Sequence, residues 1–192
     1  MSKRRSELTR EAARLFAEKG YHGTSIGDLA GALGVQKGSV YAHIESKQDL
    51  LWEIAAEGAA AFHAALDAVP EDASAIDRIR LALRGHLNVV AEQLDVATVF
   101  TREWRYLDDE RREAFVAERR RYEERIRELF GEGRDQGELR SDLDVAAAAL
   151  LFLSAANWAY TWLQRGRDTG ELADRFFRLL VDGMRGYSTP AA

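Results

Sequence analysis

The chain has 192 residues, contains no cysteine and carries a formal net charge of -5 at pH 7. This length allows one or two compact domains with a substantial core, and the lack of cysteine excludes disulfides, cysteine-ligated zinc and thiol catalysis. No apolar run approaches the roughly 18 residues needed to cross a bilayer, and the N-terminal region is charged where a signal peptide would be apolar. We therefore expect a cytoplasmic protein with no membrane partner.

The charge is unevenly distributed along the chain. The first fifty residues carry a slight excess of Lys and Arg over Asp and Glu, so the remaining residues hold the whole negative excess. A mildly basic segment on an acidic chain is typical of a protein that binds a polyanion at one end. A random scatter of charges is the alternative explanation.

The composition predicts an all-α fold. Ala, Leu, Glu and Arg dominate, only two prolines occur, and alternating runs of β-branched residues are absent. Apolar periodicity interrupted by Gly-rich and Asp-rich breaks predicts nine helices. Their expected ranges are 5–19, 26–33, 37–44, 47–69, 76–93, 96–107, 109–133, 143–165 and 169–186.

The first two helices have clear boundary signals. Gly20 follows the first helix and Gly34 follows the second, as expected of C-terminal stops. Ser25 and Asp28 have the spacing of a capping box, in which each side chain accepts a hydrogen bond from the other residue's backbone N–H. The second helix should therefore begin immediately after Ser25.

The third helix is the unusual element. Residues 37–44 make it too short to be stable alone, and only Val40 and Ile44 are apolar anchors that dock it on its neighbours. Its other side chains are small or polar and must face outward. Two helices joined by a short glycine-containing turn, the second with such a face, are typical of a helix-turn-helix whose recognition helix enters the major groove.

Residues 24–51 resemble the DNA-binding signature of the TetR family of bacterial transcription regulators. Gln36 and Ile44 depart from the usual Ser or Thr and the usual Phe. The resemblance implies a nine-helix, two-domain architecture, with a helix-turn-helix domain of three helices over 1–46 and a helical ligand-binding and dimerisation domain over 47–192. The residues that carry it are Thr24, the turn Leu33-Gly34-Val35, Gly38, Tyr41, and the helix start Ser46-Lys47 with Leu50.

The same resemblance implies the contacts to operator DNA. Phosphates would be held by Thr24, Tyr41, His43 and Lys47, and the bases would be nearest to Gln36, Lys37 and Ser39. Taken singly, these residues have plainer explanations: Tyr is often a core residue, His is often an ordinary surface residue, and Gln at a helix start can merely cap it. The full expected set is Thr24, Ser25, Gln36, Lys37, Gly38, Ser39, Tyr41, His43 and Lys47.

Several aromatic and basic residues indicate an effector site. Arg119 lies in an otherwise apolar helical stripe with Phe115 and Tyr122, so its charge requires either an internal carboxylate such as Glu103 or an anionic ligand group. Tryptophans can stack on flat rings, although packing explains them equally well, and arginines bind phosphate. The expected ligand contacts are Arg102, Trp104, Arg119, Tyr122, and the i, i+4, i+7 set Trp158, Trp162 and Arg165.

Operator recognition requires a homodimer, because one short helix touches too few bases for specificity. Two recognition helices about 34 Å apart read a palindrome. In the family, the last two long helices of each subunit generally form the dimer interface. The apolar stripes expected to pack there are Val145, Ala149, Phe152, Ala156, Tyr160 and Leu163 on one helix, and Phe176, Leu180 and Met184 on the other.

Residues 100–144 and 157–166 look like the regulatory domain of TetR regulators of fatty-acid, phenylacetate and sterol catabolism. That resemblance implies a repressor of lipid catabolism genes that is released from double-stranded operator DNA by a small-molecule effector, an acyl-CoA thioester, and that needs no cofactor. A drug-like or hormone-like hydrophobic effector is the alternative.

The sequence also lacks the motifs of enzymes. It contains no His-x-x-x-His zinc spacing, no Gly-rich phosphate loop and no nucleophile elbow, so neither catalytic nor metal-binding residues are expected. Outside the regulators, a non-catalytic helical adaptor is the remaining alternative.

Overall fold

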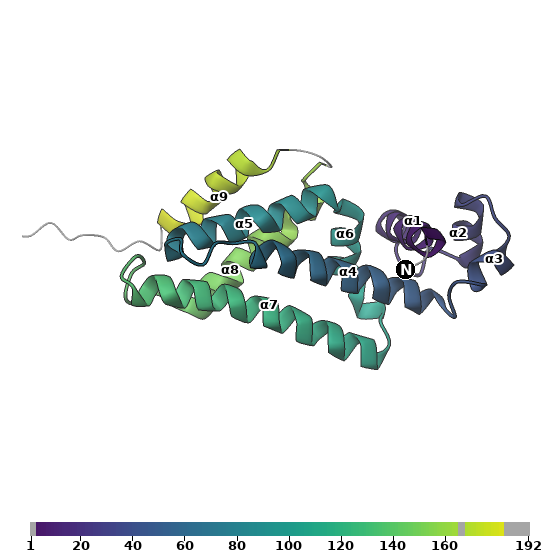
Figure 1. Ribbon diagram of the computed structural model, residues 1–192, viewed down its shortest axis with the longest axis horizontal. Helices are drawn as coiled ribbons and strands as arrows, with labels where there is room; N and C mark the ends of the chain where they lie inside the picture. Colours follow the sequence, from purple (N-terminus) through teal and green to yellow (C-terminus); the bar gives the residue numbers. More distant parts are fainter. Residues whose placement is uncertain (1–2, 165–167, 183–192) are drawn as a thin grey trace, which may run out of the picture. The chain divides into compact units, whose positions relative to one another are not determined.

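The computed structural model describes residues 3–164 and 168–182, and all the regular secondary structure within them is helical (Figure 1). This confirms the predicted fold class and the nine predicted α-helices, to which the structure adds two short 3-10 helices. None of the helices in the described ranges is long and apolar enough to cross a membrane. The elements are α1 (Lys3–Lys19), α2 (Ile26–Ala32), α3 (Lys37–Tyr41), α4 (Lys47–Asp67), α5 (Ala75–Glu92), α6 (Leu94–Arg102), η1 (Trp104–Tyr106), α7 (Asp109–Asp135), α8 (Val145–Asn157), η2 (Trp158–Thr161) and α9 (Gly170–Asp182).

The chain forms two compact units. The first unit comprises residues 1–61 and 93–118, and the second comprises residues 62–92 and 119–192. This division does not follow the expected domain boundary after residue 46, because α4 is one uninterrupted helix whose N-terminal part is buried with the first unit. The boundary after residue 46 stays a prediction.

The first unit is organised around α1. Its apolar face, Leu8, Ala12, Leu15 and Phe16, is buried as the helical spacing predicts, and α1 packs against both α2 and α6. Figure 1 shows α2 and α3 side by side next to α1. Fully burying a Leu or Phe side chain contributes about 1.5–3 kcal/mol, so this face holds α2, on which α3 packs in turn. Neither of these short helices could persist alone.

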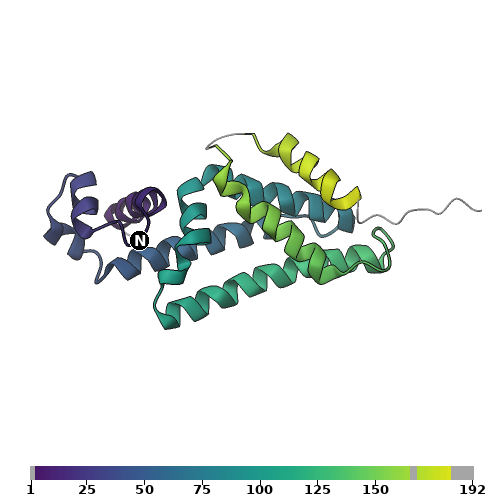
Figure 2. The same ribbon diagram turned by 180° about the vertical axis from the view of Figure 1, so that it is seen from behind.

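The second unit is organised around α5, which packs against α8, η2 and α9 (Figure 2). The N-terminus of α8 is capped by Asp144, whose carboxylate accepts a hydrogen bond from the Ala147 N–H at 3.0 Å. Further along α8, the ring of Phe152 meets that of Phe130 from α7 edge to face, with centroids 6.1 Å apart. Aromatic pairs in this geometry stabilise a core beyond the area they bury.

Two predicted helices are shorter than expected because each continues as a 3-10 helix. The helix expected over 96–107 is α6 followed by η1, and the one expected over 143–165 is α8 followed by η2. Trp and Tyr occur in both 3-10 segments, and η2 also contains Thr; these residues have lower helix propensity than the Ala and Leu of α8. The predicted extension of the last helix to residue 186 lies outside the described residues.

Candidate DNA-binding interface and effector site

The α2 helix begins with the predicted capping box. The Asp28 N–H donates to the Ser25 hydroxyl oxygen at 3.1 Å, and the Ser25 N–H donates to the Asp28 carboxylate at 2.8 Å. The Ser25 hydroxyl also donates to the Asp28 carboxylate, and this bond, the one from the Ser25 N–H, and Lys19 at 3.7 Å hold the pKa of Asp28 below its usual value. After α2, Gly34 has φ +64°, a left-handed conformation that favours glycine, so the chain turns there as predicted.

The α3 helix is anchored by one apolar face. Val40 and Ile44 are buried, which confirms their predicted anchoring role, although the helix ends at Tyr41 and not at residue 44. The Gln36 side chain makes no capping hydrogen bond, so capping does not explain it. The outward residues Gln36, Lys37, Gly38 and Ser39 are all exposed.

Tyr41 is also on the outer side of α3. It is 55% exposed, so the alternative of a core tyrosine is wrong. His43 follows α3 and is half-buried. These positions leave the side chains that are expected to contact DNA accessible, and their contacts to bases and phosphates stay predictions.

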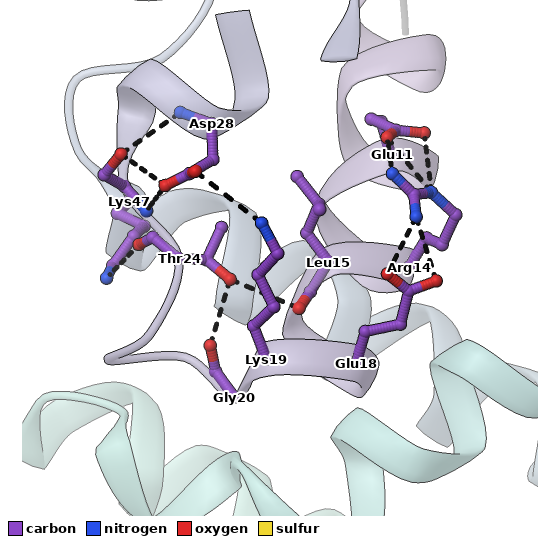
Figure 3. Close-up of polar contacts among 10 residues, drawn as sticks. Glu11, Arg14, Leu15, Glu18, Lys19, Gly20, Thr24, Asp28 and Lys47 are labelled. Atoms are coloured by element: carbon purple, nitrogen blue, oxygen red, sulfur yellow. Dashed lines mark hydrogen bonds and ion pairs between the residues drawn. The ribbon is translucent and has the colours of Figure 1, made fainter. Parts of the chain in front are cut away.

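Thr24 and Lys47 are placed differently from the other predicted contacts (Figure 3). Thr24 is only 1% exposed, and its hydroxyl donates to the carbonyl oxygens of Gly20 at 3.0 Å and Leu15 at 3.2 Å. The Lys47 ammonium donates to the carbonyl oxygens of Tyr21 at 2.7 Å and Thr24 at 2.8 Å. Burial lowers the pKa of Lys47. Both side chains therefore tie the α1–α2 turn to its surroundings, and their phosphate contacts stay predictions.

The structure adds positioning residues that the sequence did not indicate. Glu53 on α4 accepts hydrogen bonds from the Arg5 guanidinium at 2.6 Å and from the Thr9 hydroxyl at 2.7 Å. Arg5 also donates to the backbone carbonyl of His43, just after α3. These partners are far apart in sequence, so no local spacing could have revealed that α1 and α4 together hold the end of α3.

The predicted effector contacts fall in both units. In the first unit, Arg102 is exposed and Trp104 is stacked on Phe115 with centroids 5.7 Å apart. In the second unit, Arg119 is half-buried, with its pKa lowered by desolvation, and Tyr122 is buried. The ligand roles of these four residues stay predictions.

Glu103, the suggested internal partner of Arg119, lies in the first unit. It is buried and accepts a hydrogen bond from the Tyr21 N–H at 2.8 Å. Its other oxygen is 3.9 Å from the guanidinium of Arg102. The Glu103 carboxylate therefore serves as the hydrogen-bond acceptor of a backbone N–H at the α1–α2 turn.

The prediction that Trp158, Trp162 and Arg165 share one face of an α-helix is wrong. The α-helix ends at Asn157, so an i, i+4, i+7 spacing no longer places these residues in line. Trp158 is 62% exposed, and Trp162 contacts the ring of Phe176 at 5.5 Å between centroids. Arg165 lies outside the described residues.

The apolar stripes expected at the dimer interface also need correction. Ala149, Phe152 and Ala156 of α8 are buried within the second unit of a single chain. The exposed large apolar side chains of α8 and α9 lie at other positions, Leu150, Leu151 and Leu179. The period of the stripe identified the core-facing side of α8, since core and interface faces of a helix share the same spacing. On α9, Phe176 and Leu180 are half-buried, and Met184 lies outside the described residues.

His86 on α5 is a further candidate effector-site residue, which the sequence did not indicate. It is 2% exposed, and its Nδ1 lies 3.1 Å from the Tyr122 hydroxyl oxygen. Burial lowers its pKa to about 3. Its partner on α7 is 36 residues away, so this buried polar pair has no local sequence signal.

The similarity to known proteins covers nearly the whole chain. Residues 8–54 match the model of bacterial regulatory proteins of the tetR family, and residues 72–184 match that of the tetracyclin repressor-like C-terminal domain. The fatty acid metabolism regulator protein of Bacillus subtilis is 26% identical over 177 residues, which is 90% of this chain and 91% of the relative. The HTH-type transcriptional repressor KstR2 of Rhodococcus jostii is 28% identical over 195 residues, covering 95% and 92%.

A solved structure is similar in fold and sequence. The crystal structure of AibR in complex with isovaleryl coenzyme A and operator DNA superposes with a TM-score of 0.83 at 29% identity, covering 93% of this chain and 98% of that one. Both halves of the chain thus match one kind of DNA-binding regulator, which has no catalytic role. The chain therefore belongs to the TetR family and is a TetR-type transcriptional repressor.

Proposed function

We propose that this repressor binds palindromic operator DNA as a homodimer and is released by an acyl-CoA thioester. The observation that carries the DNA-binding part is the division of α3 into a buried and an exposed side. Val40 is buried, whereas Lys37, Ser39 and Tyr41 are exposed. A helix that presents small and polar side chains outward can enter the major groove, where base edges are read.

Dimerisation is supported by apolar side chains on the surface of the second unit. Leu150 and Leu151 of α8 and Leu179 of α9 are all more than half exposed. Where such side chains form a contiguous patch, the patch typically marks a protein interface. A second copy of the chain also provides the second recognition helix that a palindrome requires.

The effector class is supported by the relatives. One of them is a fatty acid metabolism regulator, and the similar AibR structure contains isovaleryl coenzyme A. Within the second unit, Tyr122 is buried and Arg119 is half-buried, so these two residues predicted to contact the effector lie at the edge of the core. An effector releases DNA only if it binds the DNA-free conformation more tightly than the DNA-bound one.

The test is fluorescence anisotropy of labelled DNA from upstream of the coding sequence, with a scrambled duplex as control. Palmitoyl-CoA and phenylacetyl-CoA should each be titrated into the preformed complex, with free CoA as the matched control. We expect specific binding of the upstream DNA and release by at least one of the two thioesters. Failure of both to release DNA and to give heat in titration calorimetry would reject the effector class, while the operator binding would stand.

A further inference from the structure

His86 is a buried polar side chain that the operator contacts do not use. It projects from α5 into a cluster with Phe62 and Tyr122, whose ring centroids lie 4.4 Å and 5.8 Å from that of His86. Because burial lowers its pKa to about 3, the imidazole is neutral at physiological pH. A neutral imidazole has one N–H donor and one acceptor nitrogen.

The contact with Tyr122 determines which nitrogen carries the proton. The Tyr122 hydroxyl oxygen and Nδ1 of His86 are 3.1 Å apart. If the hydroxyl donates to Nδ1, the ring hydrogen is on Nε2, and only this N–H lacks a partner. If Nδ1 donates, both the hydroxyl hydrogen and Nε2 lack partners. Since each unsatisfied buried polar group costs about 1–3 kcal/mol, the first arrangement is favoured.

The Nε2 atom of His86 is the unsatisfied group. It is buried and has no hydrogen-bond partner among the residues that the structure describes. The Asn157 side chain, at the end of α8, opposes the fall in the pKa of His86 as a weak hydrogen-bond partner, but the geometry at Nε2 falls short of a full hydrogen bond. A buried N–H donor in this position requires an acceptor, which a bound molecule can supply.

The surroundings favour an uncharged acceptor. The rings of Phe62 and Tyr122 provide no positive charge, and Arg125, whose charge acts on Tyr122, is already paired with Asp67 at 2.7 Å. A carboxylate next to His86 would therefore be buried without a counter-ion, which is far more costly than burying a carbonyl group that accepts one hydrogen bond.

We propose that the His86 Nε2–H donates a hydrogen bond to the thioester carbonyl oxygen of the acyl-CoA effector, with Tyr122 as the positioning residue that fixes the tautomer. This inference rests on the proposed function, because it assumes that an acyl-CoA is bound. It goes further in assigning the polar atom of the chain that recognises the junction between the acyl chain and CoA.

The test compares two ligands that differ only at the carbonyl group. Palmitoyl-CoA and S-hexadecyl-CoA, the thioether of the same chain length, are titrated into the full-length wild-type protein by calorimetry. The thioether should bind about tenfold more weakly, because it leaves Nε2–H unsatisfied. Equal affinities would overturn the inference but leave acyl-CoA as the effector. Failure of both ligands to bind would overturn the proposed effector class and this inference with it.

Variants then assign the preference to His86. In His86→Phe, which keeps an aromatic ring and removes the N–H, the two ligands should bind equally, and a persistent tenfold preference would overturn the assignment. His22→Phe, at an exposed position of the first unit, is the matched control and should keep the preference. A readout that needs no variant is the ¹⁵N spectrum of wild-type His86. The Nε2–H signal should shift with palmitoyl-CoA and not with the thioether; identical shifts with both ligands would contradict the proposed bond.

Discussion

Single side chains of the helix-turn-helix differ in what their loss should change. Tyr41 is exposed and makes no contact that the fold requires, whereas the Lys47 ammonium is bonded to the carbonyl groups of Tyr21 and Thr24. Two of the three N–H donors of Lys47 are thus used inside the protein, which leaves one for a phosphate. Both side chains are expected to contact phosphate, but only the loss of Lys47 should also destabilise the fold.

The variants Tyr41→Phe and Lys47→Ala separate these consequences. Tyr41→Phe removes one exposed hydroxyl, so it should weaken binding to every DNA sequence while changing the free energy of unfolding by less than about 0.5 kcal/mol. Lys47→Ala should weaken DNA binding and also lower the free energy of unfolding by about 1–3 kcal/mol, because two carbonyl groups lose a charged donor. Urea unfolding and DNA anisotropy measure the two quantities. An unchanged unfolding free energy in Lys47→Ala would contradict its structural role.

His86 should make stability depend on pH. The unfolded chain protonates this histidine near its ordinary pKa of 6.5, whereas the folded chain does so only at about 3. Between these values the unfolded state binds more protons, so the free energy of unfolding falls as the pH decreases, by about 2 kcal/mol at pH 5. Urea unfolding at pH 7 and pH 5 should show this loss in the wild type and a smaller loss in His86→Phe. Parallel losses in both proteins would contradict the assignment.

At the scale of helices, α2 depends on its capping box more than on its length. Seven residues are too few for an independent helix, and the Ser25 hydroxyl accepts the Asp28 N–H at its start. Ser25→Ala should lower the free energy of unfolding by about 1 kcal/mol. Ser39→Ala, which removes an exposed hydroxyl of α3, is the matched control and should change it by less than about 0.5 kcal/mol. Equal effects of the two substitutions in urea unfolding would argue against the cap.

Local signals predicted most helices because caps, glycine stops and apolar spacing act within a few residues. The start of α2 at Ile26, the turn at Gly34 and the anchors Val40 and Ile44 were all predictable in this way. The end of α8 was not, because the apolar spacing continues through Leu163 although the backbone changes to a 3-10 helix after Asn157. Spacing alone cannot distinguish these two conformations over a single turn.

The candidate site was less predictable than the helices because its contacts join distant parts of the sequence. The bond of Arg5 to the carbonyl group of His43 and the pair of His86 and Tyr122 have no local pattern. The family resemblance supplied the exposed residues of α3 but not these positioning contacts. The sequence could therefore predict which face of α3 is exposed, and the structure adds what holds the end of that helix in place.

For the whole molecule, the exposed leucines give a prediction about assembly. Leu179 on α9 is 79% exposed, and a negative charge there should oppose burial against a second copy. Leu179→Glu should shift sedimentation from dimer towards monomer and weaken operator binding at least tenfold, without lowering the helix content. Gln136→Glu adds the same charge at another exposed position of the second unit and should leave the dimer intact. Dimers in both variants would show that this face is not the interface.

The most direct test of the whole account is the number of chains bound to one operator. Sedimentation velocity of the protein with a labelled upstream duplex, read at the wavelengths of both protein and label, gives this stoichiometry. We expect an even number of chains, two for each palindrome, and a free duplex after addition of palmitoyl-CoA. A single chain bound to the duplex, or no binding at low salt, would contradict the claim that paired α3 helices from two copies of the chain recognise DNA.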